Sequence, residues 1–336
     1  MSTPARLGTV ESSEQLLHDL YVDLRAKIRR WAAVTKQTPQ ARMGYVGQHL
    51  VSVVTGYEGG RSGARGKDLV ISSTEFAEIK TCYRVDQLGN CLRCKARVAS
   101  VEESCPSCGS TEIERHDDSK WLIGFQHEDE FREFLRPKWY FLALFEFADL
   151  PRVDTVQVSI WRVDPLVPGF ALCLVDYRYN IQATSKSRAP FNLWPYSPKF
   201  DFMRPLLIYR ARINADNSIE TTLFPGRDAP EPNRLKPLAD YEQSRNLSSE
   251  SITSLAQELG LVLRTGPKKA SLQQIEEYAR ARDIPGDTLA DAIARAVYGD
   301  RIRPHLSQLP DELRPAVEQM LCASLGSQHS DLTLEV

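Results

Sequence analysis

Apolar side chains recur at helical spacing near the start of the chain. One face of a helix over residues 12–34 is formed by Leu16, Leu17, Leu20, Tyr21, Leu24, Ile28 and Trp31. Ser12 and Gln15 have the spacing of a capping box at its start. The pattern predicts this helix and a second one over residues 44–55.

Strand patterns follow. DLVIS and EFAEIKTCYR are two short apolar runs separated by a Ser/Thr turn, which predicts a β-hairpin. Further along, KWYFLALFEF, DTVQVSIWRV and RPLLIYRARIN have strand composition. The segment FNLWPYSPKFDFM is rich in proline and aromatic residues and predicts an ordered loop packed by its own side chains.

The pattern becomes helical again towards the end of the chain. Four amphipathic stretches are SITSLAQELGLVL, SLQQIEEYARARDI, DTLADAIARAVYG and DELRPAVEQMLCASL, and the break at Pro285 and Gly286 joins two of them as a helix-turn-helix would. We expect an α/β domain over residues 10–225, a linker over 226–247 and a helical C-terminal domain over 248–330.

Composition narrows the class of protein. A 336-residue chain with 42% hydrophobic residues can bury one large core or two smaller ones. The chain contains no apolar run of signal-peptide or membrane-span length, so we expect a cytoplasmic protein without a membrane partner. The formal net charge is −2, so any affinity for DNA must come from local basic surface.

Candidate chemistry begins in the predicted hairpin. Glu78 and Lys80 alternate onto one face of its second strand. If the turn is centred on Ser73, Asp68 lies directly opposite Glu78, with their Cβ atoms about 5 Å apart. Two carboxylates and an ammonium group can catalyse Mg²⁺-dependent phosphodiester hydrolysis. In this arrangement Asp68 and Glu78 would hold Mg²⁺. Lys80 would orient the attacking water or stabilise the transition state.

The tripeptide alone is weak evidence. An acid-x-Lys match occurs on the order of once per hundred residues by chance, and Asp118-Ser119-Lys120 matches it without a preceding strand. A surface salt bridge is the alternative interpretation. The order of helix, Gly-rich loop, Asp and hairpin favours catalysis at the first match.

Four of the seven cysteines form two C-x-x-C pairs. Cys91, Cys94, Cys105 and Cys108 have the spacing of a tetrahedral Zn²⁺ site, and four thiolates leave no position for water, so we predict a structural zinc-ribbon insertion over residues 87–112. His116 and His127 stand in no HNH-type arrangement around the cysteines and are interpreted as surface residues.

Basic residues offer DNA contacts in two places. Arg61, Arg65 and Lys67 stand among glycines just before Asp68, and the spacing excludes a nucleotide-binding phosphate loop. They are candidates for contacts to the DNA backbone, or a solvated turn. Lys268, Lys269, Arg280 and Arg282 could likewise meet DNA, although a dimerisation role for this helical module is as compatible with its apolar face.

These motifs resemble a known nuclease superfamily. GYVGQHLVSVVTG, GARGKDL and FAEIKTC are similar to the PD-(D/E)xK core, a mixed sheet flanked by helices, found in type II restriction enzymes and mismatch-repair nicking endonucleases. The Gly47-Gln48 pair resembles the latter. Relatives often carry a further acidic residue on this helix, where this chain has His49, Leu50 and Val51. A third acidic metal ligand is therefore missing here, unless Gln48 or Glu58 approaches the site.

A closer resemblance covers more of the chain. ARMGYVGQHLVSVVTG together with APFNLWPYSPKFDFMRP is similar to the MamI kind of restriction endonuclease. The resemblance implies a restriction enzyme that cleaves double-stranded DNA at an interrupted palindrome. A homodimer would present two such centres to opposite strands, and Gln48 is a further candidate DNA contact. The alternatives are a monomeric nicking endonuclease and a non-catalytic zinc-ribbon DNA-binding protein.

Overall fold

The computed structural model describes residues 6–37, 39–60, 67–125, 133–150, 154–185, 189–226, 248–264, 266–267, 269–309, 311 and 313–322. The chain forms two compact units. Unit 1 comprises Met1–Trp121, Pro137–Val163 and Leu206–Glu231, and unit 2 comprises Leu122–Arg136, Asp164–Pro205 and Pro232–Val336. The predicted linker lies outside the described residues, apart from Gly226.

A seven-stranded mixed sheet forms the centre of unit 1. Its strand order is β1-β2-β3-β8-β9-β11-β12, with β1 (Glu58–Gly59), β2 (Leu69–Val70), β3 (Phe76–Tyr83), β8 (Trp139–Phe147), β9 (Val156–Val163), β11 (Leu206–Ile213) and β12 (Ile219–Leu223). The pair β3 and β8 is parallel, and every other neighbouring pair is antiparallel. The predicted hairpin and the three later strands are thereby confirmed.

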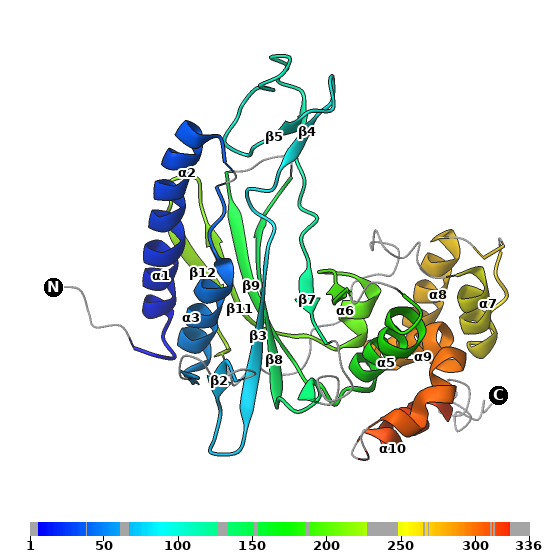
Figure 1. Ribbon diagram of the computed structural model, residues 1–336. Coiled ribbons are helices and arrows are strands. Elements are labelled where there is room, and N and C mark those ends of the chain that lie inside the picture. Colours follow the sequence, from blue (N-terminus) through cyan, green and yellow to red (C-terminus); the bar gives the residue numbers. More distant parts are fainter. Residues whose placement is uncertain are drawn as a thin grey trace. The chain divides into compact units, whose positions relative to one another are not determined.

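Helices of unit 1 lie together on one side of this sheet (Figure 1). They are α1 (Val10–Leu17), a π-helical turn (His18–Asp23), α2 (Leu24–Thr35) and α3 (Met43–Thr55). Both predicted helices are confirmed, but the predicted cap is wrong. Thr9 is the N-cap and its side chain accepts the Ser12 N–H, because the helix begins earlier than the apolar pattern does.

Unit 2 is mostly helical. Its elements are α5 (Pro168–Asp176), a π-helical turn (Tyr177–Gln182), α6 (Pro198–Phe202), α7 (Ser249–Glu258), α8 (Lys269–Ala281), α9 (Gly286–Ile302), a 3₁₀ turn (Arg303–Gln308) and α10 (Arg314–Cys322). The four predicted C-terminal helices are present. The predicted aromatic loop contains α6 and β10 (Phe191–Leu193), and β10 pairs with β7 (Trp121–Ile123).

A small three-stranded sheet follows β3. Its strands are β4 (Gly89–Cys91), β5 (Arg97–Val98) and β6 (Ile113–Glu114), in the order β5-β4-β6. Figure 1 shows β4 and β5 at the opposite end of β3 from the β2–β3 hairpin. Among the described residues, every helix is too short or too polar to cross a lipid bilayer.

Candidate active site and cysteine cluster

The register of the β2–β3 hairpin brings the two acidic residues together. Leu69 pairs with Ala77 and Val70 with Phe76, a register centred on Ser73. Asp68 lies just outside β2, and its N–H donates to the Ala77 carbonyl at 3.1 Å, so the regular pairing ends at Leu69. Asp68 still lies close to Glu78, because its charge contributes to raising the pKa of Glu78. The predicted turn centre at Ser73 gives the observed register.

Two donors hold the Asp68 carboxylate. The Gln48 side-chain amide donates to Oδ1 at 2.8 Å, and the Ile79 N–H donates to Oδ2 at 2.8 Å. Gln48 comes from α3, 20 residues earlier, and the carboxylate is half-buried. The orientation of Asp68 is therefore set by the protein's own hydrogen bonds.

Lys80 lies against Glu78. Its Nζ is 2.5 Å from Glu78 Oε1, and the two side chains are 26% and 16% exposed. Burial raises the pKa of Glu78, the Lys80 ammonium lowers it, and the Asp68 carboxylate raises it further. Tyr140 of β8 pairs with Glu78 across the parallel register and is almost fully buried. Burial, with the Glu78 and Asp68 charges, raises the pKa of Tyr140 well above its usual value.

A close approach of α3 to β3 positions Gln48. A Cβ on Gly47 would stand 2.0 Å from Thr81 Oγ1, so only glycine allows this contact. Gly60 has a similar role next to Asp68: a Cβ there would lie 1.9 Å from the Lys67 carbonyl oxygen, and the Gly60 N–H donates to the Asp68 carbonyl at 2.9 Å. Both glycines keep the backbone around the carboxylate pair compact.

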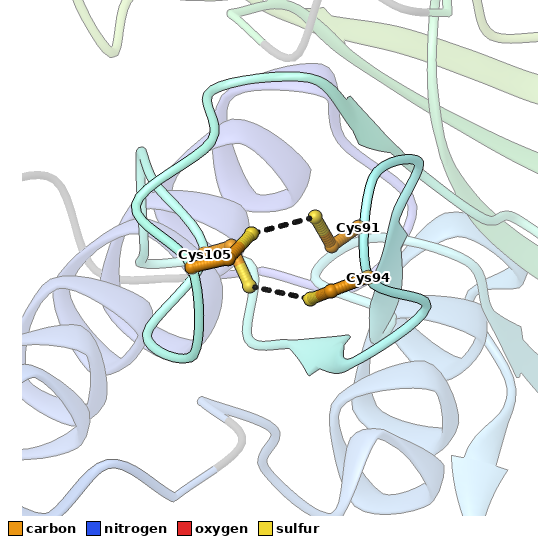
Figure 2. Close-up of side chains that lie close together, drawn as sticks. Cys91, Cys94 and Cys105 are labelled. Atoms are coloured by element: carbon orange, nitrogen blue, oxygen red, sulfur yellow. Dashed lines mark hydrogen bonds between the residues drawn. The ribbon is translucent and has the colours of Figure 1, made fainter.

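The four cysteines of the predicted zinc site form one cluster. The Sγ atoms of Cys91, Cys94, Cys105 and Cys108 all lie within 4.8 Å of one another, and Figure 2 shows Cys91, Cys94 and Cys105 with their sulfurs turned toward each other. Cys91 Sγ is 3.6 Å from Cys108 Sγ, and Cys94 Sγ is 3.5 Å from Cys105 Sγ. This donor set can hold a soft tetrahedral ion.

The two knuckles share one backbone design. The Lys95 N–H donates to the Cys91 carbonyl at 2.9 Å, and the Gly109 N–H donates to the Cys105 carbonyl at 2.9 Å. Lys95 and Gly109 both have a left-handed backbone, with φ of 62° and 71°. The backbone N–H of Cys94 lowers the pKa of Cys91 to about 6. The sulfurs are thus presented by two matching turns.

A buried ion cluster at the end of β3 was not predicted. Asp86 is fully buried, and Arg25 donates to its two oxygens at 2.7 and 3.0 Å. Arg29 donates at 3.0 Å and the Tyr83 hydroxyl at 3.2 Å. This cluster fastens α2 to the segment that leads into the cysteine module.

Other predicted site residues have varied environments. Four of them lie outside the described residues: Arg61, Arg65, His127 and Lys268. Lys67 is exposed, with its Nζ 5.6 Å from the centre of the Phe76 ring. Glu58 is exposed on β1, and His49 is exposed on α3. The expectation that no strand precedes Asp118 is wrong, because β6 ends at Glu114, but Asp118 itself lies outside any strand.

Comparison with known proteins adds two findings. The family model described as "MamI restriction endonuclease" matches residues 30–238. The type II restriction enzyme MamI of Microbacterium ammoniaphilum is 39% identical over 81 residues, a stretch that covers 23% of this chain and 25% of that enzyme. The chain thus matches about a quarter of the length of this curated relative. No solved structure matches the chain.

Proposed function

Because this chain belongs to the MamI restriction endonuclease family, we propose that it is a type II restriction endonuclease, which hydrolyses phosphodiesters of double-stranded DNA at a specific site. The observation that carries the proposal is the position of Asp68 against β3: its carboxylate accepts the Ile79 N–H, next to Glu78 and its partner Lys80. We further propose that unit 1 contains a PD-(D/E)xK core. Its helix, hairpin and parallel β3–β8 pair follow the order of that core.

Each polar side chain of the site has a distinct role in the proposal. Asp68 and Glu78 provide two half-buried carboxylates, a donor set that fits Mg²⁺. Bound Mg²⁺ would supply charge stabilisation and a more acidic water. Lys80 holds Glu78 in place and can donate to water or to the phosphate. Gln48 positions Asp68, because its amide nitrogen donates to Oδ1.

The cysteine cluster is proposed to hold a structural Zn²⁺. Four sulfur donors within one coordination sphere match a closed site, and no carboxylate or imidazole is among them. Few apolar side chains surround the cluster: its buried residues are Cys91, Val98 and Cys105. A module with so small a core gains its stability from metal ligation.

Double-stranded DNA is the proposed partner, with Lys67 and the two arginines of the same loop as backbone contacts. A homodimer would present two such sites to opposite strands of a palindromic or interrupted palindromic sequence. The exposed position of Lys67, directly before Asp68, supports a phosphate contact close to the carboxylate pair.

The test is plasmid cleavage in the presence and absence of Mg²⁺. We expect linear DNA with defined ends from the wild type, and no product from Asp68→Ala or Lys80→Ala variants that keep the wild-type circular dichroism spectrum. Gel filtration then separates the alternatives. A monomer that yields only open circles would indicate a nicking enzyme, and DNA binding without any cleavage would indicate a non-catalytic zinc-ribbon protein.

A further inference from the structure

We propose that the first knuckle of the cysteine module, residues 91–97, binds the phosphate backbone of double-stranded DNA through Arg93, Lys95 and Arg97. We call these residues the basic knuckle. The inference deepens the proposed function and rests on it, because it gives the DNA substrate a contact remote from the carboxylate pair.

Charge is concentrated on this knuckle. Arg93, Lys95 and Arg97 are all exposed, and none forms a hydrogen bond or ion pair with any side chain in the part of the chain that the structure describes. The corresponding second knuckle, residues 105–109, has the sequence CPSCG and carries no charge. Since the net charge of the chain is −2, these cations do not reflect a generally basic composition.

Lys95 has a left-handed backbone conformation, which costs glycine less conformational free energy than it costs lysine. Its φ of 62° matches the φ of 71° at Gly109, and the two residues make equivalent hydrogen bonds. Glycine adopts this left-handed conformation freely, whereas a residue with a Cβ does so at a cost. Lys95→Gly therefore removes the cation and relieves the backbone in a single substitution.

The knuckle presents its cations on a preorganised loop. Cys91 and Cys94 tie both sides of the turn to the sulfur cluster, and the Cys91 N–H donates to the Ala96 carbonyl at 2.9 Å. Cations held in this way lose less conformational freedom when they meet phosphates than cations on a flexible loop do. Guanidinium groups also fit phosphate oxygens in bidentate geometry.

The position along β3 determines which phosphates these cations reach. Glu78 lies five residues before the end of β3 at Tyr83, and five strand residues span about 17 Å. The module begins beyond that end (Figure 1). If the DNA runs along β3, the contacted phosphates lie about half of a DNA helical turn from the scissile one, since a full turn is about 34–36 Å.

The first experiment measures binding of the full-length, zinc-loaded protein to a DNA fragment that carries a mapped cleavage site, without Mg²⁺, over a series of salt concentrations. In the variant R93Q/K95Q/R97Q, the slope of log K against log salt should become shallower by about 0.9 for each lost phosphate contact, up to about 2.7. An unchanged slope with unchanged zinc content would overturn the proposal, as would a wild type that binds RNA or protein but no DNA.

A second pair of variants separates the effect of losing the lysine charge on DNA binding from the effect of the substitution on stability. Lys95→Gly should raise the melting temperature, because it relieves the left-handed backbone, and should weaken DNA binding. The matched control is Lys36→Gly, at an exposed lysine with φ of 60° at the end of α2. It should raise the melting temperature and leave DNA binding unchanged. If Lys95→Gly behaves as Lys36→Gly does, Lys95 makes no phosphate contact.

The outcome is separable from that of the proposed function. A shallower salt slope in a protein that never cleaves DNA would support the basic knuckle and reject hydrolysis. Mg²⁺-dependent cleavage with an unchanged slope would retain the proposed function and reject the basic knuckle.

Discussion

The β2–β3 hairpin and the cysteine module differ in what holds their functional groups. In the hairpin, Asp68 is oriented by the Gln48 amide and the Ile79 N–H, and Glu78 by Lys80. In the module, the buried interior consists of Val98 and two of the four clustered cysteines. We therefore expect the hairpin to keep its geometry without a metal, whereas the module should lose its fold. A site whose geometry is held by protein hydrogen bonds can lose and regain its ion without unfolding. A site whose core is formed by thiolates loses folding free energy when its ion leaves.

Metal removal should have the largest effect. Cys91→Ser, or a strong zinc chelator, is expected to abolish zinc binding and to open the module, because structural Zn²⁺ supplies about 10–16 kcal/mol of apparent binding free energy in small zinc domains. Native mass spectrometry measures the bound zinc, and limited trypsin digestion should then cut at Arg93, Lys95 and Arg97.

Cys322→Ser is the matched control, since Cys322 is an exposed thiol at the end of α10. It should keep its zinc and its digestion pattern. A module that resists trypsin after complete loss of zinc would break the comparison, because its stability would then come from packing alone.

Breaking the buried ion cluster should have the next largest effect. Burial raises the pKa of Asp86, but the hydrogen bond from Arg25 and the charges of both arginines outweigh this effect and hold the pKa low. Asp86→Ala leaves Arg25 and Arg29 without their shared anion, and we expect a loss of about 3–5 kcal/mol in the free energy of unfolding, measured in urea.

The sign of the pH dependence follows from the lowered pKa. The stabilisation by Asp86 is present above its ordinary pKa of 3.8 and is lost as the pH falls through the lower value of the folded state. Asp118→Ala, at an exposed carboxylate, should change stability little at any pH. Equal stability of both variants at neutral pH would contradict an anchoring role for Asp86.

Overpacking the contact between α3 and β3 should have a smaller effect. Gly47→Ala places a methyl group against Thr81 and is expected to cost about 1–3 kcal/mol. It should also reduce cleavage, since Gln48 would shift away from Asp68. Gly44→Ala tests the same helix where a Cβ meets nothing within 4 Å, and it should stabilise by up to about 1 kcal/mol. Thermal unfolding and plasmid cleavage measure both variants.

Neutralising Glu78 should have the smallest effect on stability and the opposite sign. Because burial raises the pKa of Glu78, ionising it costs stability as the pH rises above the ordinary value of 4.5. Glu78→Gln should therefore melt slightly higher than the wild type at pH 7.5 and equally at pH 4, while cleavage is lost. A lower melting temperature at pH 7.5 would mean that the ion pair with Lys80 outweighs burial.

Local patterns predicted part of this molecule and could not predict the rest. The hairpin register followed from the centre of one turn, and the sulfur cluster followed from the spacing of two C-x-x-C pairs. The hydrogen bond from Gln48 to Asp68 and the Asp86 cluster join residues 20 and 61 positions apart. Such pairings depend on how α2 and α3 pack on the sheet, which hydrophobic periodicity does not reveal.

The parallel pairing of β3 with β8 has a consequence for folding kinetics. The chain leaves β3 at Tyr83 and returns at Trp139, and the cysteine module lies within this long crossover. Early ligation of one ion by all four thiolates would shorten the effective loop that must close before β8 can dock, and so reduce the entropic barrier to forming the centre of the sheet. Refolding should then be faster when the ion is supplied at the start than when it is added after collapse.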